Sequence, residues 1–371
     1  TDRLIRDARR RLGRMIDAAG DERAGDEKAV LKALVFGDRS GIGDALRQRF
    51  NRAGVGHLLA ISGLHVGIVA VLALGMFRYL FSFATPLLWR GWGRAWAAAA
   101  TLVPVLAYGL LAGMSPSTQR AVIMVTVFLL SVMLGRSRDT FNTLAAAAMV
   151  ILIIRPPAIF SISFQLSFAA VLAIVAGLQK IRIERKPPGG PLGIAVNKVV
   201  GGAVVSVLAV AGTAPVVLYH FNQTSLLGVA ANLLLVPLVG FAAVPLGLFS
   251  AAAAFFFEPV AAAGFGLSLQ ILHWALMLVA WFASLPFAAF HVVTPSLPEI
   301  ILYYLAGWAL FNWRTVPLAP WILAFVLVAA AGDGFYWSYQ RLWHRDLRVT
   351  AIDVGQGTST LMELPGGGVM V

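Results

Sequence analysis

Long apolar runs dominate the chain after residue 52 and decide what it can fold into. About ten such runs follow one another, each close to the ~20 residues that an α-helix needs to cross a bilayer. Hydrophobic residues are 59% of the 371 residues and charged residues only 12%, about half the charged fraction of a soluble domain. The sequence therefore predicts an all-α polytopic membrane protein with about ten transmembrane helices. Prolines make some helices short or broken; they are Pro104, Pro116, Pro215, Pro237 and Pro245.

Residues 1–56 differ from the rest of the chain because they are charged and amphipathic. Up to Arg52 they hold 13 basic and 9 acidic residues, a net charge of +4. Apolar residues such as Leu4, Ala8 and Leu12 recur there at helical spacing. We predict basic juxtamembrane helices that lie in the headgroup region of the bilayer. The arginines favour contact with anionic lipid, and binding of DNA phosphates is the alternative.

The stretch GHLLAISGLHVGIVAV, residues 56–71, places polar side chains inside an apolar segment. If it forms one helix, His57, Ser62 and His65 lie close to one face and make a polar stripe. Polar residues inside a membrane protein commonly face a wet cavity, so the stripe is a candidate lining. The alternative is that the histidines are satisfied by neighbouring backbone or hydroxyl groups. Two glycines four apart predict close helix packing: Gly63 and Gly67.

Three further polar patches interrupt the apolar runs, at residues 110–121, 161–170 and 213–232. Arg120 begins a helix after a tight turn and suits either an anion or a lipid headgroup. Phe164 and Phe168 are a weak candidate for base stacking, because phenylalanines in membrane helices more often pack. The uncharged groups suit a wet path. The remaining candidates are Ser115, Ser117, Gln119, Gln165, Ser167, His220, Asn222 and Asn232.

The sequence lacks the residues that several functional classes require. Ion-coupled transporters need acidic or Asp/Lys relays within their spans, and none occurs here. No GxxxxGK[ST] loop and no cysteine are present, which argues against nucleotide hydrolysis and excludes a thiolate metal site. We find no internal repeat of the kind that secondary transporters carry. No catalytic residue and no metal ligand is predicted for this chain.

Basic residues in the loops predict an orientation. Loops after odd-numbered spans hold eleven Lys and Arg, whereas the other loops hold only Arg120 and Arg155. By the positive-inside rule the basic loops face the cytoplasm, so both chain ends face outward. The loop at 180–191 is the most basic of them. It serves as a topology signal or, alternatively, as a docking site for a cytosolic partner.

Residues 348–371 change character and resemble the start of a soluble β-rich domain. Short strands are expected at Val349–Val354, Thr360–Leu364 and Val369–Val371, with turns between them. Asp353 is a poor metal ligand candidate, because an acid beside glycines at a strand end is more often part of a turn.

Five segments in this order resemble the signature segments of the ComEC competence-protein family. They are AGVGHLLAISGLHVGI, LAGMSPSTQRAVIM, RPPAIFSISFQLSFAAVLAI, NLLLVPLVGFAAVPLG and AIDVGQGTSTLMELPGG, and the resemblance covers roughly residues 26–371. It implies a bacterial inner-membrane channel that brings one DNA strand into the cytoplasm during natural transformation. It also implies an outward-facing metallo-β-lactamase-like domain that degrades the other strand.

The resemblance also defines what this chain lacks. The resemblance implies an OB-like domain ahead of this region, which we do not expect within this sequence, and it implies HxHxDH-type metal ligands beyond Val371. We therefore expect juxtamembrane helices at 1–56, a transmembrane channel domain at 57–335 and a truncated metallo-β-lactamase-like domain at 348–371. Zinc or manganese is expected only in the part beyond this chain. The resemblance implies single-stranded DNA as a partner, with a receptor outside and an ATPase or single-strand-binding proteins inside.

A channel for a polyanion needs a wet path that is neutral to weakly positive. We predict that the lining is drawn from His57, Ser62, His65 and the residues of the three patches. Two rival functions remain: a membrane anchor for an extracellular metal-dependent nuclease, and a small-solute permease.

Overall fold

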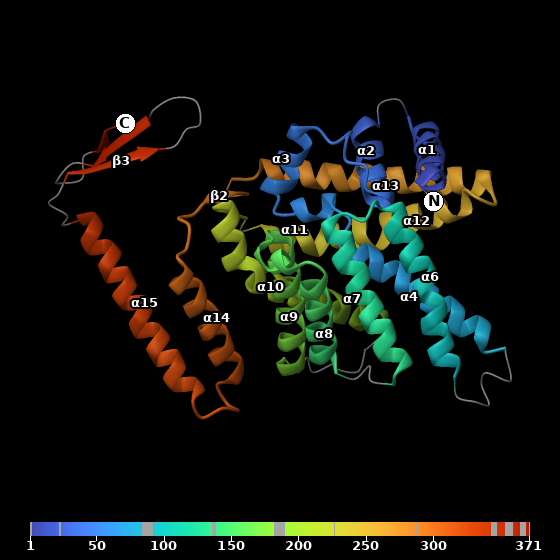
Figure 1. Cartoon of the computed structure of the whole chain (residues 1–371). Coiled ribbons are helices and arrows are strands. Elements are labelled where there is room, and N and C mark those ends of the chain that lie inside the picture. The colour runs from blue at the N-terminus through green and yellow to red at the C-terminus, as the bar shows by residue number, and fades with distance from the viewer. Residues whose placement is uncertain are drawn as a thin grey trace. The chain divides into compact units, whose positions relative to one another are not determined.

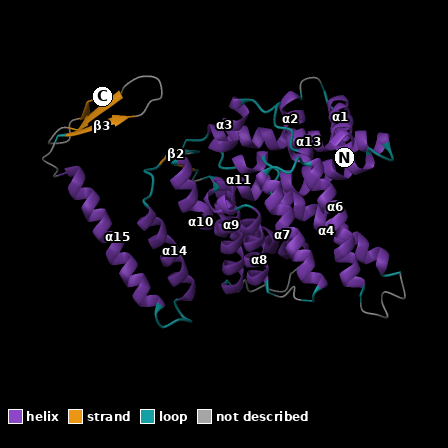
Figure 2. Ribbon diagram, viewed as in Figure 1, coloured by secondary structure: helices purple, strands orange, loops and turns teal. Residues whose placement is uncertain are grey.

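The computed structural model describes residues 2–21, 24–83, 92–135, 139–181, 190–225, 227–286, 288–342, 347–352, 359–363 and 369–370. The chain forms two compact units, Thr1–Thr294 and Pro295–Val371. Helices dominate, and the described strands belong to two small sheets (Figure 2).

The first unit begins with α1 (Asp2–Ala19), α2 (Gly25–Phe36), α3 (Asp44–Arg52), the 3₁₀-helix η1 (Gly56–Leu59), α4 (Gly63–Phe81), α6 (Gly93–Leu111), α7 (Pro116–Met133), α8 (Thr140–Ile154), the 3₁₀-helix η2 (Pro156–Phe160) and α9 (Ile162–Lys180). It continues with α10 (Gly190–Phe221), β1 (Gln223–Thr224), α11 (Gly228–Leu235), the π-helix η3 (Val236–Ala243), α12 (Val244–Ala253), α13 (Glu258–Ser284) and β2 (Phe290–His291).

Eight helical segments among the described residues are long and apolar enough to cross a bilayer, which confirms an all-α polytopic membrane protein. They are α4, α6, α7, α9, α13, most of α10, most of α15 (Ala319–Leu342), and the continuous run α11–η3–α12. The count is below the expected ten because α8 has 15 residues and α14 (Leu297–Asn312) has 16. The prolines break fewer helices than expected. Pro104 and Pro215 lie inside α6 and α10, both of which continue past them.

The main apolar core lies between the N-terminal helices and the α11–α13 layer. α1 contacts α2 and α13, α2 contacts α12 and α13, and α3 contacts α13. In Figure 1, α13 runs crosswise to α6 and α7. Leu12 and Ile16 of α1 are fully buried in this core. Protein thus covers Leu12 and Ile16 of the apolar face of α1, while Leu4 on the same face is 76% exposed. The location of these helices in the headgroup region stays a prediction.

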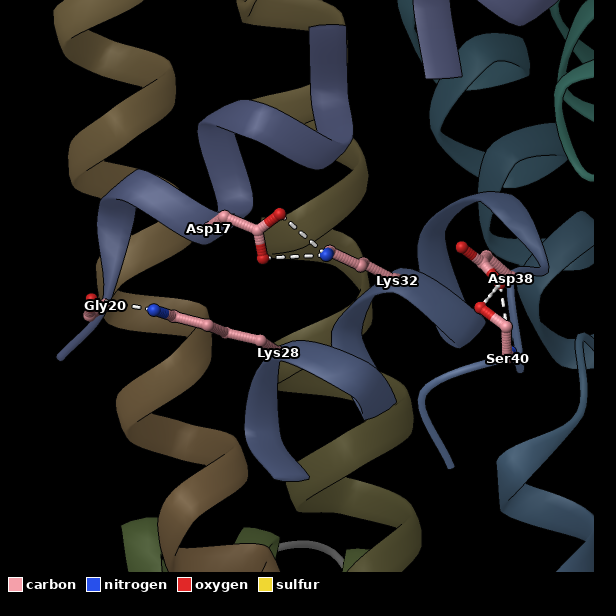
Figure 3. A network of polar contacts seen from close by, with 6 residues as sticks. All are labelled: Asp17, Gly20, Lys28, Lys32, Asp38 and Ser40. Carbon is pink, nitrogen blue, oxygen red and sulfur yellow. Dashed lines mark hydrogen bonds and ion pairs between the residues drawn. The ribbon is translucent and has the colours of Figure 1, made fainter. Parts of the chain in front are cut away.

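Polar contacts fasten α1 to α2 (Figure 3). The Lys32 ammonium lies 2.7 Å from a carboxylate oxygen of Asp17, and Lys28 donates to the carbonyl of Gly20 at 2.9 Å. In the loop after α2, the backbone N–H and the hydroxyl of Ser40 donate to Asp38 at 3.0 and 2.7 Å. These two hydrogen bonds lower the pKa of Asp38. The loop stays shaped by an ionised carboxylate at neutral pH.

The second unit contains α14 (Leu297–Asn312), α15 (Ala319–Leu342) and the strands β3 (Arg348–Ile352), β4 (Ser359–Glu363) and β5 (Val369–Met370). The strands form an antiparallel sheet in the order β3-β4-β5, in which Thr350 pairs with Leu361. The three strands expected from the sequence are confirmed, each within two residues at its ends. Asp353 lies outside the described residues.

Candidate functional site

The stretch at 56–71 is two helices, not one. His57 lies in η1 with its side chain exposed, Ala60 to Ser62 are not helical, and α4 begins at Gly63. The prediction of one continuous polar stripe is therefore wrong. The break arises because Ser62 has an extended backbone (φ −115°, ψ 174°) and caps the new helix. His57 and His65 do not share a helical face.

Ser62 and His65 form a reciprocal cap at the start of α4. The Leu64 N–H donates to the Ser62 hydroxyl at 3.3 Å, and the Ser62 N–H donates to Nδ1 of His65 at 3.2 Å. His65 thus takes the place that Glu or Gln occupies in an ordinary capping box. Because Nδ1 accepts a hydrogen bond, the proton of the neutral ring is on Nε2. His65 is 2% exposed, and its Nε2 has no hydrogen-bond partner in the described protein.

Arg120 ties α7 to α9. One guanidinium nitrogen donates to the Pro116 carbonyl at 2.8 Å, and the other donates to the hydroxyls of Ser163 at 2.5 Å and Ser167 at 3.3 Å. The side chain is 6% exposed, and Nε has no partner among the described residues. A guanidinium held this way does not reach out to a lipid headgroup. Ser163 was not among the predicted residues, although it lies one helical turn before Ser167.

The rest of the 110–121 patch closes its own turn. The Ser115 hydroxyl lies 3.0 Å from that of Ser117 and 2.9 Å from that of Thr118, and Ser115 caps α7. Gln119 is exposed and donates to the Met114 carbonyl at 2.8 Å. These side chains hold the turn at the N-terminal end of α7.

The other face of α9 contacts α10 through Gln165. Its Oε1 lies 3.0 Å from Nε2 of His220, and its amide nitrogen donates to the Ile159 carbonyl at 3.1 Å. The rings of Phe164 and Phe168 pack on each other with centroids 4.3 Å apart, and Phe164 is buried. That packing occupies one face of each ring, and base stacking on these phenylalanines stays a prediction.

Asn222 and Asn232 differ in their surroundings. Asn222 has φ +52°, and its Oδ1 accepts from the Thr294 hydroxyl at 2.9 Å. It therefore ties the residue before β1 to the segment after β2, beside the antiparallel pairing of these two strands. Asn232 lies on α11, and its Oδ1 is buried without a described partner.

Among the residues that the structure describes, none packs against Gly63 or Gly67 where a side chain would stand. An added Cβ at either position would meet no described atom within 4 Å. The structure thus gives no close helix approach there.

Several of these residues share one feature, a buried polar atom without a hydrogen-bond partner among the described residues. Among the described residues five side chains have such an atom: His65, Arg120, Thr126, Ser225 and Asn232. Three of the five were predicted from the sequence for the path. An unpaired buried polar group costs ~1–3 kcal/mol, a cost that a bound water removes. The described residues contain no group of three His, Cys, Asp or Glu that would hold a metal ion.

Gly54 holds the turn before η1 against the start of α11. It has φ +74°, and an added Cβ would lie 2.9 Å from Cα of Gly228. We expect Gly54→Ala to destabilise the protein by at least ~2 kcal/mol, because the left-handed backbone and the contact with main chain both oppose a side chain. Thermal unfolding in detergent measures this effect. Gly75→Ala in α4, where an added Cβ meets nothing, should be neutral or stabilising; equal melting temperatures of the two variants would contradict the prediction.

Comparison with known proteins identifies the family. A family model described as "Competence protein" matches residues 34–317. Competence protein ComA of Neisseria gonorrhoeae is 30% identical over 351 residues, which are 94% of this chain and 46% of that protein. ComE operon protein 3 of Bacillus subtilis is 32% identical over 220 residues, 59% of this chain and 26% of that protein. The uncharacterized protein YcaI of Escherichia coli is 27% identical over 359 residues, 92% of this chain and 44% of that protein.

No solved structure gave a significant match. The chain spans less than half the length of each of these three relatives. The match of the family model across most of the sequence shows that this chain belongs to the competence protein family.

Proposed function

We propose that this chain is a channel that translocates single-stranded DNA across the bacterial inner membrane during natural transformation. The observation that carries the proposal is a set of buried polar atoms on α4, α7 and α11 that have no hydrogen-bond partner among the described residues. Three of them are His65 Nε2, Arg120 Nε and Asn232 Oδ1. In a bilayer such atoms need water, and a water-filled interior is what a polyanion requires. Membership of the competence family supports DNA as the solute.

The proposed orientation places the basic loops in the cytoplasm and both chain ends outside. It rests on the excess of Lys and Arg in the loops after α4, α7 and α9, and it takes the 15-residue apolar helix α8 to cross the bilayer as well, so that these loops share one side. On this orientation the turn between α6 and α7, which carries Ser115, opens to the outside. A receptor would deliver DNA there, and cytosolic proteins would take up the emerging strand.

Reconstitution of this chain into liposomes tests the proposal against its two rivals. A fluorescent 20-nucleotide strand is added outside, with its quencher-labelled complement trapped inside, so that passage is read as loss of fluorescence. We expect quenching that depends on the protein and is absent with double-stranded DNA. Quenching no faster than in protein-free liposomes would favour a membrane anchor. Release of a small trapped dye without passage of the strand would favour a permease.

A further inference from the structure

Helix α1 carries a stripe of four arginines on the face opposite its buried residues. Arg3, Arg6, Arg10 and Arg14 are spaced by three, four and four residues, so they lie on one narrow helical face about 16 Å long. All four side chains are exposed, whereas Leu12 and Ile16 on the other face are completely buried. We call these four residues the arginine stripe.

The arginine stripe is not neutralised by the protein around it. None of its members forms an ion pair with a described residue. Asp17 lies on the same face, but its carboxylate is bound to Lys32. Asp7 lies beside the face and likewise has no described ion pair. Every basic residue of α1 is arginine, whose planar fork matches phosphate geometry better than the lysine ammonium does.

The packing of α1 argues against lipid as the partner. A helix that lies in the bilayer interface places its apolar face among the acyl chains. In α1 the part of that face formed by Leu12 and Ile16 packs instead on α2 and α13, so it is not available to lipid, whereas Leu4 at the N-terminal end is 76% exposed. The arginines point away from the core that α1 shares with these helices. Their partner therefore approaches from solution.

The position of α1 connects the arginine stripe to the candidate path. The Arg9 guanidinium donates through Nε to the carbonyl of Leu111, the last residue of α6, at 2.9 Å. The turn that follows Leu111 carries Ser115 and leads into the helix of Arg120. A DNA strand that lies along α1 thus reaches the same end of the helical bundle as this turn.

We propose that the arginine stripe binds the phosphate backbone of single-stranded DNA, without sequence preference, before the strand enters the bundle. This inference rests on the proposed function for the choice of DNA as the polyanion. The chemistry is four charge-assisted contacts to successive stretches of backbone. Such binding is strongly dependent on salt.

The test is binding of a fluorescent dT20 strand to the full chain in nanodiscs of phosphatidylcholine, across a range of salt concentrations. The variant Arg3→Gln, Arg6→Gln, Arg10→Gln, Arg14→Gln removes the stripe, and the corresponding lysine variant keeps its charge. A matched control removes four charges from the most basic loop: Lys180→Gln, Arg182→Gln, Arg185→Gln, Lys186→Gln. Because the four arginines are exposed, the stripe variants should melt like the wild type.

We expect the glutamine stripe variant to bind at least tenfold more weakly at 0.1 M salt. The slope of log affinity against log salt should fall by up to ~2.8, since each single-strand phosphate contact contributes about 0.7. The lysine variant and the loop control should stay within about threefold of the wild type.

Two results would overturn the inference. The first is an unchanged affinity and salt slope in the glutamine stripe variant. An equal loss of affinity in the loop control would count the same way, because net charge alone would then explain the loss. The other is unchanged DNA binding together with loss of phosphatidylglycerol from protein purified out of native membranes, which would make the stripe a lipid contact. Because binding is measured without translocation, failure here leaves the liposome assay intact, and a failed liposome assay leaves this binding result standing.

Discussion

Replacing Arg120 by leucine is expected to lower the rate of strand passage into liposomes by at least tenfold. The guanidinium holds the Pro116 carbonyl and two serines of α9, and each hydrogen bond to a charged group contributes about 1.5–3 kcal/mol. Without it, α7 and α9 lose their polar connection and Ser163 is left without its donor. The rate of quenching measures passage, and thermal unfolding measures the loss of stability.

Arg120→Lys separates positioning from simple charge. A lysine keeps the positive charge, but its single ammonium does not replace a fork that reaches oxygens on two helices. If Arg120 positions α7 against α9, the lysine variant should resemble the leucine variant. Wild-type passage in the lysine variant would instead show that only the charge matters. Arg155→Leu is the matched control, because the Arg155 side chain is exposed and has no hydrogen-bond or ion-pair partner among the described residues; it should behave as wild type.

The second large effect is expected at His65, where two roles are separable. His65→Gln keeps a side-chain acceptor for the Ser62 N–H, as in an ordinary capping box, but removes the buried Nε2–H. We expect this variant to retain its melting temperature and to lose at least tenfold in passage. Ser62→Ala removes the hydroxyl that caps α4, which also lies 3.0 Å from Nδ1 of His65; it costs about 1 kcal/mol and leaves Nε2 in place. It should melt earlier and still pass the strand.

Wild-type passage in His65→Gln would reduce the histidine to a cap and remove it from the path. His57, exposed in η1, remains a predicted lining residue that the same assay can test with His57→Leu. A loss there at unchanged melting temperature is the expected outcome.

The sequence predicted the helices better than the positions where they start and stop. Apolar runs report transmembrane helices because bilayer thickness sets their length. The break at Ala60–Ser62 was missed because those residues fit a helical pattern, and the cap uses a histidine at the third position instead of the usual Glu or Gln. The strands were found because alternation and turn glycines are local signals.

The sequence indicates which polar residues belong to the candidate site, but not which residues they contact. Arg120 and Gln165 were chosen as polar residues in apolar surroundings, and both are partly or fully enclosed by other helices. Their partners Ser163 and His220 lie 43 and 55 residues away, a pairing that no local pattern specifies. Similarly, helical periodicity showed that α1 has an apolar face, but only tertiary structure shows that α13 covers it.

The core shared by α1, α2 and α13 has a consequence for biosynthesis. Glu27 of α2 and His273 of α13 are joined by a 2.8 Å contact although 246 residues separate them. During translation the apolar faces of α1 and α2 are made first and stay uncovered while the intervening apolar helices are synthesised and inserted. Long-range pairing of this kind folds slowly and exposes apolar surface in the meantime. Completion of this core therefore waits for the docking of α13, and chaperone dependence should be concentrated in the interval before it.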